Sequence, residues 1–141
     1  MRDQRAVDRE HLRLLAIFHF VVAGLAVAGI GFLFLHYSLM SAVFNNPQMW
    51  QGKPNQPPPL PKEFFALFKW FYVIGGISLI LAAVGNVLSG LFIQARKHRV
   101  FSIVVAAMDC LQIPFGTVLG VFTIIVLVRE SVAELYQSSP P

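Results

Sequence analysis

VFSIVVAAMDCLQIPFGTVLGVFTIIVLV, residues 100–128, is an apolar stretch too long to cross a membrane as one straight helix. At 1.5 Å per residue it would reach about 43 Å, whereas the hydrocarbon core of a bilayer is about 30 Å thick. Pro114 lies near its middle and removes a helical hydrogen bond. We expect one transmembrane helix kinked at Pro114, because each half alone is short for a span. The alternative is a re-entrant hairpin of two short legs.

Two more apolar runs precede this stretch. From Leu14 to Leu35 only His19 interrupts apolar and small residues, and a second run extends from about Trp70 to Ile93. Each is long enough for the roughly 20 residues that a transmembrane helix requires. The chain is 56% hydrophobic and 13% charged, which is not the composition of a soluble domain. The sequence therefore predicts an all-α, membrane-embedded bundle of three transmembrane helices, or of four shorter legs if residues 100–128 fold back.

The predicted boundaries treat residues 1–141 as a single membrane domain. Its segments are a polar cytoplasmic stretch (1–13), a first helix (14–44), a proline-rich extracytoplasmic connection (45–63), a second helix (64–95), a basic cytoplasmic turn (96–99), a third helix (100–128) and a tail (129–141). Prolines in the connection favour an extended backbone, and the start of the tail suits a short helix.

Basic residues predict the orientation of the bundle. Arginines precede the first span, and the turn Arg96-Lys97-His98-Arg99 follows the second, whereas the other side carries Lys53, Lys62, Lys69 and, in a three-span arrangement, Arg129. Positive charge close to spans is retained in the cytoplasm. We therefore expect a cytoplasmic N-terminus.

Small residues recur at helical spacing along the spans. Helices in lipid associate through close backbone approach at small residues and through hydrogen bonds between helices. The predicted packing residues are Gly75, Ser78, Ala82, Gly85 and Ser89 in the second helix, and the G-x-x-x-G pair Gly116 and Gly120 in the third.

Strongly polar residues interrupt these faces at similar depths. His19, Asn86 and Asp109 all lie on the order of 8 to 14 Å below the cytoplasmic boundary, with Gln112 one turn from Asp109. A charged Asp at that depth costs roughly 2.5 to 3.5 kcal/mol and requires a partner. These four residues therefore form a predicted buried polar cluster. It either fixes the register of the helices or holds a proton or ion.

Other chemistry is not indicated. The sequence has no H-E-x-x-H, C-x-x-C or glycine-rich phosphate loop, and its one cysteine, Cys110, has no disulfide partner. A basic stripe with interleaved aromatic residues, typical of nucleic-acid binding, is also missing. We therefore expect no enzymatic activity, no cofactor, no metal site and no nucleic-acid partner.

Two segments resemble a known family. LRLLAIFHFVVAG (12–24) and DCLQIPFGTVLGVFTIIVLVRESV (109–132) are similar to small, uncharacterised bacterial integral membrane proteins that carry an acidic residue and Cys ahead of P-x-G-T-x-L-G-x-x-T. The residues that match the pattern are His19, Asp109, Cys110, Pro114, Gly116, Thr117 and Gly120. The proline-rich connection departs from it. The resemblance implies a bacterial inner membrane and supplies no activity.

These observations predict a non-enzymatic, multi-pass protein of the bacterial inner membrane. We expect it to be an accessory subunit of a larger membrane complex or a homo-oligomer, with the lipid bilayer and other membrane subunits as its partners. The alternative is a small proton-linked transporter or channel that uses Asp109 with His19.

Overall fold

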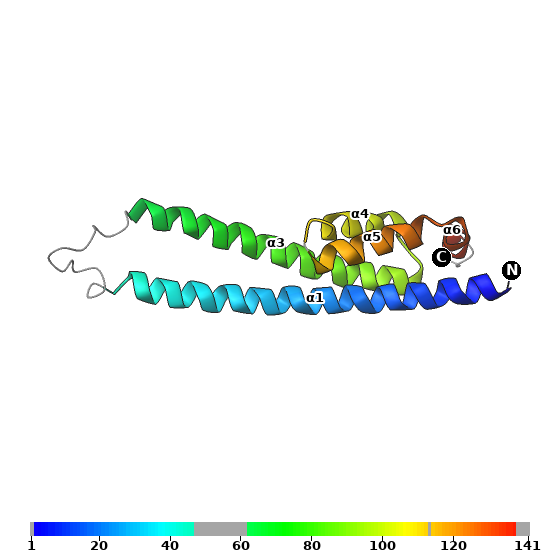
Figure 1. Cartoon of the computed structure of the whole chain (residues 1–141), viewed down its shortest axis with the longest axis horizontal. Helices are drawn as coiled ribbons and strands as arrows, with labels where there is room; N and C mark the ends of the chain where they lie inside the picture. Colours follow the sequence, from blue (N-terminus) through cyan, green and yellow to red (C-terminus); the bar gives the residue numbers. More distant parts are fainter. Residues whose placement is uncertain (1, 47–61, 113, 138–141) are drawn as a thin grey trace. The chain divides into compact units, whose positions relative to one another are not determined.

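The computed structural model describes residues 2–46, 62–112 and 114–137, and these residues form helices joined by turns, without strands. Figure 1 shows the chain path. The helices are α1 (Arg2–Phe44), α3 (Lys62–Ala95), α4 (Arg99–Asp109), α5 (Phe115–Val128) and α6 (Glu130–Gln137). The expected all-α architecture is confirmed.

Two helices, α1 and α3, are long and apolar enough to cross a membrane. The qualifying segments are Ala6–Phe44 and Ala66–Ala95, with a mean hydropathy of 2.3 and 2.1 in their most apolar windows. Only 28% of each window is buried inside the protein, so most of the apolar surface of both helices faces outward. The charged residues before Leu14 and the apolar run after them belong to one continuous helix, α1.

The third helix kinked at Pro114 was a wrong prediction. The structure has two helices here, α4 and α5, which lie side by side with opposite directions (Figure 1). Arg99 at the start of α4 donates from Nε to the carbonyl of Leu127 at the end of α5, at 2.7 Å. A single helix would hold these two residues far apart. The alternative prediction, a hairpin, describes the observed geometry.

Glycines explain why the two legs close on each other. A β-carbon at Gly120 would collide with the carbonyl oxygen of Ala106 and approach Cys110 Sγ to 2.6 Å. A β-carbon at Gly116 would collide with the carbonyl oxygen of Asp109. The G-x-x-x-G pair therefore joins α5 to α4 within one chain, through backbone contact that a larger residue would prevent.

Pro114 begins a helix and does not kink one. It occupies the N-cap position of α5, where a missing N–H removes no helical hydrogen bond. Within the preceding turn, Gln112 donates its backbone N–H to the carbonyl of Asp109 at 2.8 Å. The Thr117 hydroxyl donates to the Cys110 carbonyl at 2.9 Å. The carbonyls of Asp109 and Cys110 lie where the chain reverses and have no helical partner, and these two bonds satisfy them.

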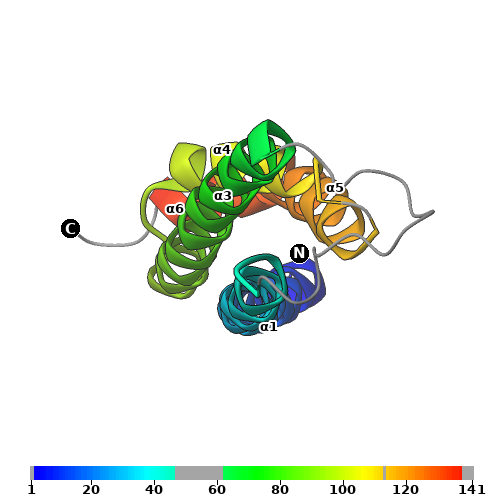
Figure 2. The ribbon, with the colours of Figure 1, turned by 90° about the vertical axis from the view of Figure 1, so that its left-hand side faces the viewer.

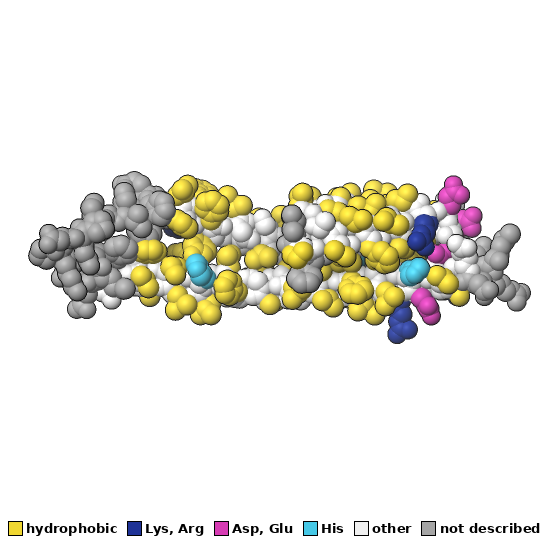
Figure 3. All heavy atoms as spheres, in the orientation of Figure 1, with side chains coloured by type: hydrophobic (Ala, Val, Ile, Leu, Met, Phe, Trp, Pro, Cys, Tyr) yellow, Lys and Arg dark blue, Asp and Glu magenta, His cyan; other side chains and the backbone are white. Residues whose placement is uncertain are grey.

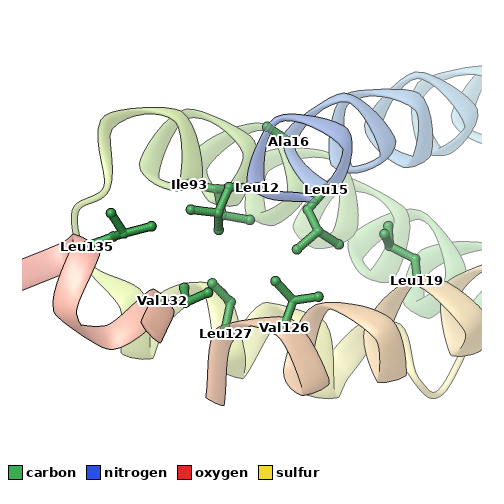
Figure 4. Packing of buried hydrophobic residues seen from close by; sticks show 9 residues of the cluster. All are labelled: Leu12, Leu15, Ala16, Ile93, Leu119, Val126, Leu127, Val132 and Leu135. Atoms are coloured by element: carbon green, nitrogen blue, oxygen red, sulfur yellow. The ribbon is translucent and has the colours of Figure 1, made fainter. Parts of the chain in front are cut away.

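The chain divides into two compact units, each described by itself. The first unit comprises residues 1–26 and 81–141. In it, the start of α1 lies across from the end of α3 and from the α4–α5 hairpin (Figure 2). Its apolar core draws on α1, α3, α5 and α6, and Figure 4 shows the side chains pointing toward one another. They are Leu12, Leu15, Ala16, Ile93, Leu119, Val126, Leu127, Val132 and Leu135.

The second unit comprises residues 27–80, the later part of α1 and the earlier part of α3. Leucines of each helix lie over glycines of the other. Leu79 lies against Gly29, and Leu33 lies against Gly75 and Gly76. The proline-rich connection falls largely on residues 47–61, and the last residues of the tail are 138–141; both ranges lie outside the described residues.

Candidate functional site: a buried polar cluster

Three helices of the first unit meet at His19, Asn86 and Asp109. The imidazole Nδ1 of His19 lies 2.6 Å from the Asn86 side-chain oxygen, and the Asn86 amide donates to Asp109 Oδ1 at 2.8 Å. His19 and Asn86 are 0% exposed and Asp109 is 1% exposed. The structure therefore joins α1, α3 and α4 through a chain of two hydrogen bonds with Asn86 at its centre.

The amide of Asn86 fixes the proton positions at His19. Its nitrogen donates both to Asp109 and, at 3.1 Å, to the carbonyl of Ala82 one turn earlier in α3. Its oxygen is therefore the atom that faces His19, and an amide oxygen only accepts. It follows that His19 Nδ1 carries a hydrogen and donates it to Asn86.

The other imidazole nitrogen faces two hydroxyl groups. His19 Nε2 lies 3.4 Å from Ser89 Oγ on α3 and 3.4 Å from Thr123 Oγ1 on α5. Both hydroxyls are fully buried. With Nδ1 protonated, Nε2 of a neutral ring accepts from these hydroxyls, and His19 thereby connects α5 to the other helices.

One atom of the cluster has no hydrogen-bond partner. Asp109 Oδ2 is buried, makes no hydrogen bond to any residue that the structure describes and lies 3.8 Å from His19 Nδ1. An unsatisfied buried carboxylate oxygen is costly, and such groups concentrate at sites that bind or transfer something. This oxygen is the one position in the cluster with spare capacity to take a proton or a small ligand.

Gln112 does not join the cluster, contrary to the predicted four-residue set. It lies in the turn after α4, where the chain has already left the helix, and its side chain is exposed. The prediction placed it one helical turn beyond Asp109 on a continuous helix, which the structure does not have. Sequence reasoning missed that Ser89 and Thr123 complete the cluster, although both lie on the small-residue faces.

The predicted packing residues fall into different environments. Gly85 approaches Val105, Ser89 is buried in the cluster and Ala82 is half-buried. Gly116 and Gly120 hold the hairpin, as described above. Ser78 is exposed, because in the second unit only one other helix covers α3. Gly75 meets only the tip of the Leu33 side chain, at 3.9 Å.

A second group of polar side chains lies at the end of the first unit where α1 begins and α6 follows α5, and sequence analysis did not predict it. Asp8 is 1% exposed although it lies among solvated charges in the sequence, and Arg129 lies 3.8 Å from its carboxylate. Burial raises the pKa of Tyr136 to about 12, against the opposing effect of Arg99 and Arg96. Charged side chains of the first unit gather at this end (Figure 3).

The described residues contain no group of three or more His, Cys, Asp or Glu side chains that could hold a metal ion. Comparison with protein-family models, with curated proteins and with solved structures finds no match to this chain. The cluster is therefore interpreted from its own geometry. It can cross-link four helices, and it can hold one proton or one small ligand at Asp109 Oδ2.

Proposed function

We propose that the chain is a non-enzymatic, multi-pass protein of the bacterial inner membrane that works as a subunit of a larger assembly, with other membrane proteins or with copies of itself. Two long apolar helices with outward-facing apolar surface support the membrane location. The resemblance of residues 12–24 and 109–132 to small bacterial membrane proteins supports the inner membrane.

The hairpin strengthens the proposed orientation. Arg129 follows α5 and pairs with Asp8, so it belongs to the side on which the chain begins. This side then carries the N-terminal arginines, the basic turn at 96–99 and Arg129, against Lys53, Lys62 and Lys69 on the other. Retention of basic residues in the cytoplasm therefore favours a cytoplasmic N-terminus together with a cytoplasmic α6.

The exposed turn of the hairpin is the observation that carries the subunit proposal. Leu111 is 75% exposed, and Gln112 beside it is also exposed. Both residues lie in the turn between the apolar helices α4 and α5, at the opposite end of these helices from the charged side chains of the unit. Non-helical backbone within the hydrocarbon layer is tolerated only where protein or water covers it. A second protein surface over this turn satisfies that requirement.

Cross-linking from the turn tests the proposal. A photo-reactive amino acid at position 112 should give a protein adduct in native membranes, and mass spectrometry of the adduct identifies a copy of the chain or another subunit. The matched control is position 34, because Phe34 is 73% exposed on α1; it should give mainly lipid adducts. Lipid adducts alone at both positions would contradict the subunit proposal.

A second function, proton-linked transport, rests on Asp109 Oδ2. Among the described residues this buried carboxylate oxygen has no hydrogen-bond partner, and it lies beside His19. Asp109→Asn separates the two functions. Loss of assembly or stability indicates a structural cross-link, whereas intact assembly with loss of pH-driven flux in proteoliposomes indicates a proton site.

A further inference from the structure

Two adjoining cavities open between α1 and α3 in the second unit. One has a volume of about 450 Å³ and reaches to Met40, Phe44 and Asn45 near the end of α1. The other, of about 320 Å³, extends toward Ile30 and Leu33. Tyr37, Lys69 and Tyr72 line both cavities and therefore mark where they meet. Neither cavity involves the polar cluster of the first unit.

The polar groups of this site have a definite character. His36 Nδ1 lies 2.7 Å from the Tyr72 hydroxyl, and the rings of Tyr37 and Tyr72 meet edge to face at 5.2 Å. Lys69 adds a cation, and no carboxylate is found among the described residues that line either cavity. One ammonium group beside hydroxyl and imidazole groups, with no carboxylate among them, suits an anion.

The two cavities differ in polarity along α1. The first contains His36, Ser41 and Asn45 with apolar residues, whereas beyond the three shared residues the second is lined by Ile30, Leu33, Phe34 and Val73. The second cavity lies deeper in the apolar run of α1. A ligand that filled both would therefore carry its charge at the end of the helix and an apolar chain toward the middle.

We propose that this site binds an anionic phospholipid, with the phosphate at Lys69 and Tyr72 and an acyl chain in the deeper cavity. The proposal rests on the membrane location proposed above. Lysine and tyrosine also occur at membrane interfaces as unspecific anchors. A specific lipid site differs from an unspecific anchor because it distinguishes one lipid headgroup from another. In the proposed site, Lys69 alone governs that distinction.

Native mass spectrometry of the full chain in a neutral maltoside detergent measures this distinction. Phosphatidylglycerol and phosphatidylcholine with the same acyl chains are titrated in parallel. We expect phosphatidylglycerol to bind about fivefold more tightly, in line with one lysine facing an anionic headgroup. Lys69→Gln should remove the preference, while Lys97→Gln, which changes an exposed lysine in the turn between α3 and α4, should retain it. Inorganic phosphate should not displace the lipid, because it cannot fill the apolar cavity.

Equal binding of the two lipids, or a preference that survives Lys69→Gln, would overturn the proposal, and so would displacement by inorganic phosphate at equal concentration. Circular dichroism of each variant confirms that the helices are retained. Alkaline carbonate washing of the cell membranes tests the membrane location separately. A chain that stays in the membrane but shows no lipid preference refutes the lipid site alone, whereas a chain that is washed off refutes both proposals.

Discussion

The two units of the chain solve helix packing differently. In the first unit, segments of α1, α3, α4 and α5 surround His19, and hydrogen bonds connect them across a fully buried centre. In the second unit, two helices meet through leucines that lie on glycines, and the polar contact between His36 and Tyr72 is only partly buried. Two helices cannot enclose a side chain, whereas four can. Buried polar cross-links and open cavities therefore occur in different parts of one chain.

The largest loss of stability should come from a larger side chain at the contact between α4 and α5. Gly120→Ala places a methyl group against the carbonyl of Ala106, and the backbone cannot move away without separating the legs. We expect a loss of about 3 kcal/mol in the free energy of unfolding. The measurement is denaturation by sodium dodecyl sulfate in mixed micelles, followed by circular dichroism.

Gly31→Ala is the matched control, because nothing lies within 4 Å of the added carbon in α1. Alanine favours helix over glycine by about 1 kcal/mol, so this variant should be no less stable than the parent. Equal losses for the two variants would show that the α4–α5 contact is not as close as described.

The next largest effect should come from the centre of the cluster. Asn86→Ala leaves His19 Nδ1 without its acceptor and Asp109 Oδ1 without its donor. We expect a loss of about 2 kcal/mol in unfolding free energy, measured in the same micelles. Ser78→Ala on the same helix is the control, since Ser78 is exposed, and it should change stability little. If the cluster does not stabilise the fold, the two variants will have the same unfolding free energy.

A smaller effect is expected in the second unit. Tyr72→Phe removes the hydroxyl that contacts His36, in a site that remains partly open. The loss should be about 0.5 kcal/mol, because groups outside a closed core find other partners. Tyr37→Phe is the control, because it removes a hydroxyl from the neighbouring ring and keeps the edge-to-face contact of that ring with Tyr72. If Tyr72→Phe costs as much as Asn86→Ala, the contrast between the units is wrong.

A last effect on stability is absent at neutral pH and appears only at alkaline pH, at the charged end of the first unit. Burial raises the pKa of Tyr136 to about 12, whereas an unfolded tyrosine titrates at about 10. The unfolded chain therefore loses this proton first, and the contribution of Tyr136 to stability, complete below pH 10, is lost as the pH rises toward 12. Absorbance of tyrosinate in the parent and in Tyr136→Phe should show one late titration that the variant lacks. If the titration that Tyr136→Phe lacks occurs near pH 10 in the parent, the burial of this ring is contradicted.

Residue patterns were sufficient to predict the two long apolar helices and the meeting of His19, Asn86 and Asp109, because helical rise places these three residues at one depth in antiparallel segments. They were not sufficient to decide between a kink and a hairpin at Pro114, because proline is compatible with both. Two features of the sequence were signals for the hairpin. Residues 100–128 are too long for one straight membrane span, and small residues recur on both sides of Pro114, at Ala106, Cys110, Gly116 and Gly120. Their meaning depends on which faces touch, and only tertiary structure shows that.

Asp8 escaped prediction for a related reason. In the sequence it lies among exposed charges, and its burial arises because α6 and the end of α5 return to the start of α1. That return follows from the hairpin. A three-span arrangement sends residues 129–141 to the opposite side of the membrane and leaves Asp8 in water.

The side of the membrane on which α6 lies therefore tests the central claim most directly. Single cysteines at Gln4, Asn45 and Gln137 are introduced into a Cys110→Ala background and labelled in intact cells and in inverted vesicles with a membrane-impermeant maleimide. All three replaced residues are exposed. A hairpin predicts that positions 4 and 137 react from the same side and position 45 from the other. Labelling of 137 together with 45, opposite to 4, would show that the chain crosses three times and would contradict the hairpin.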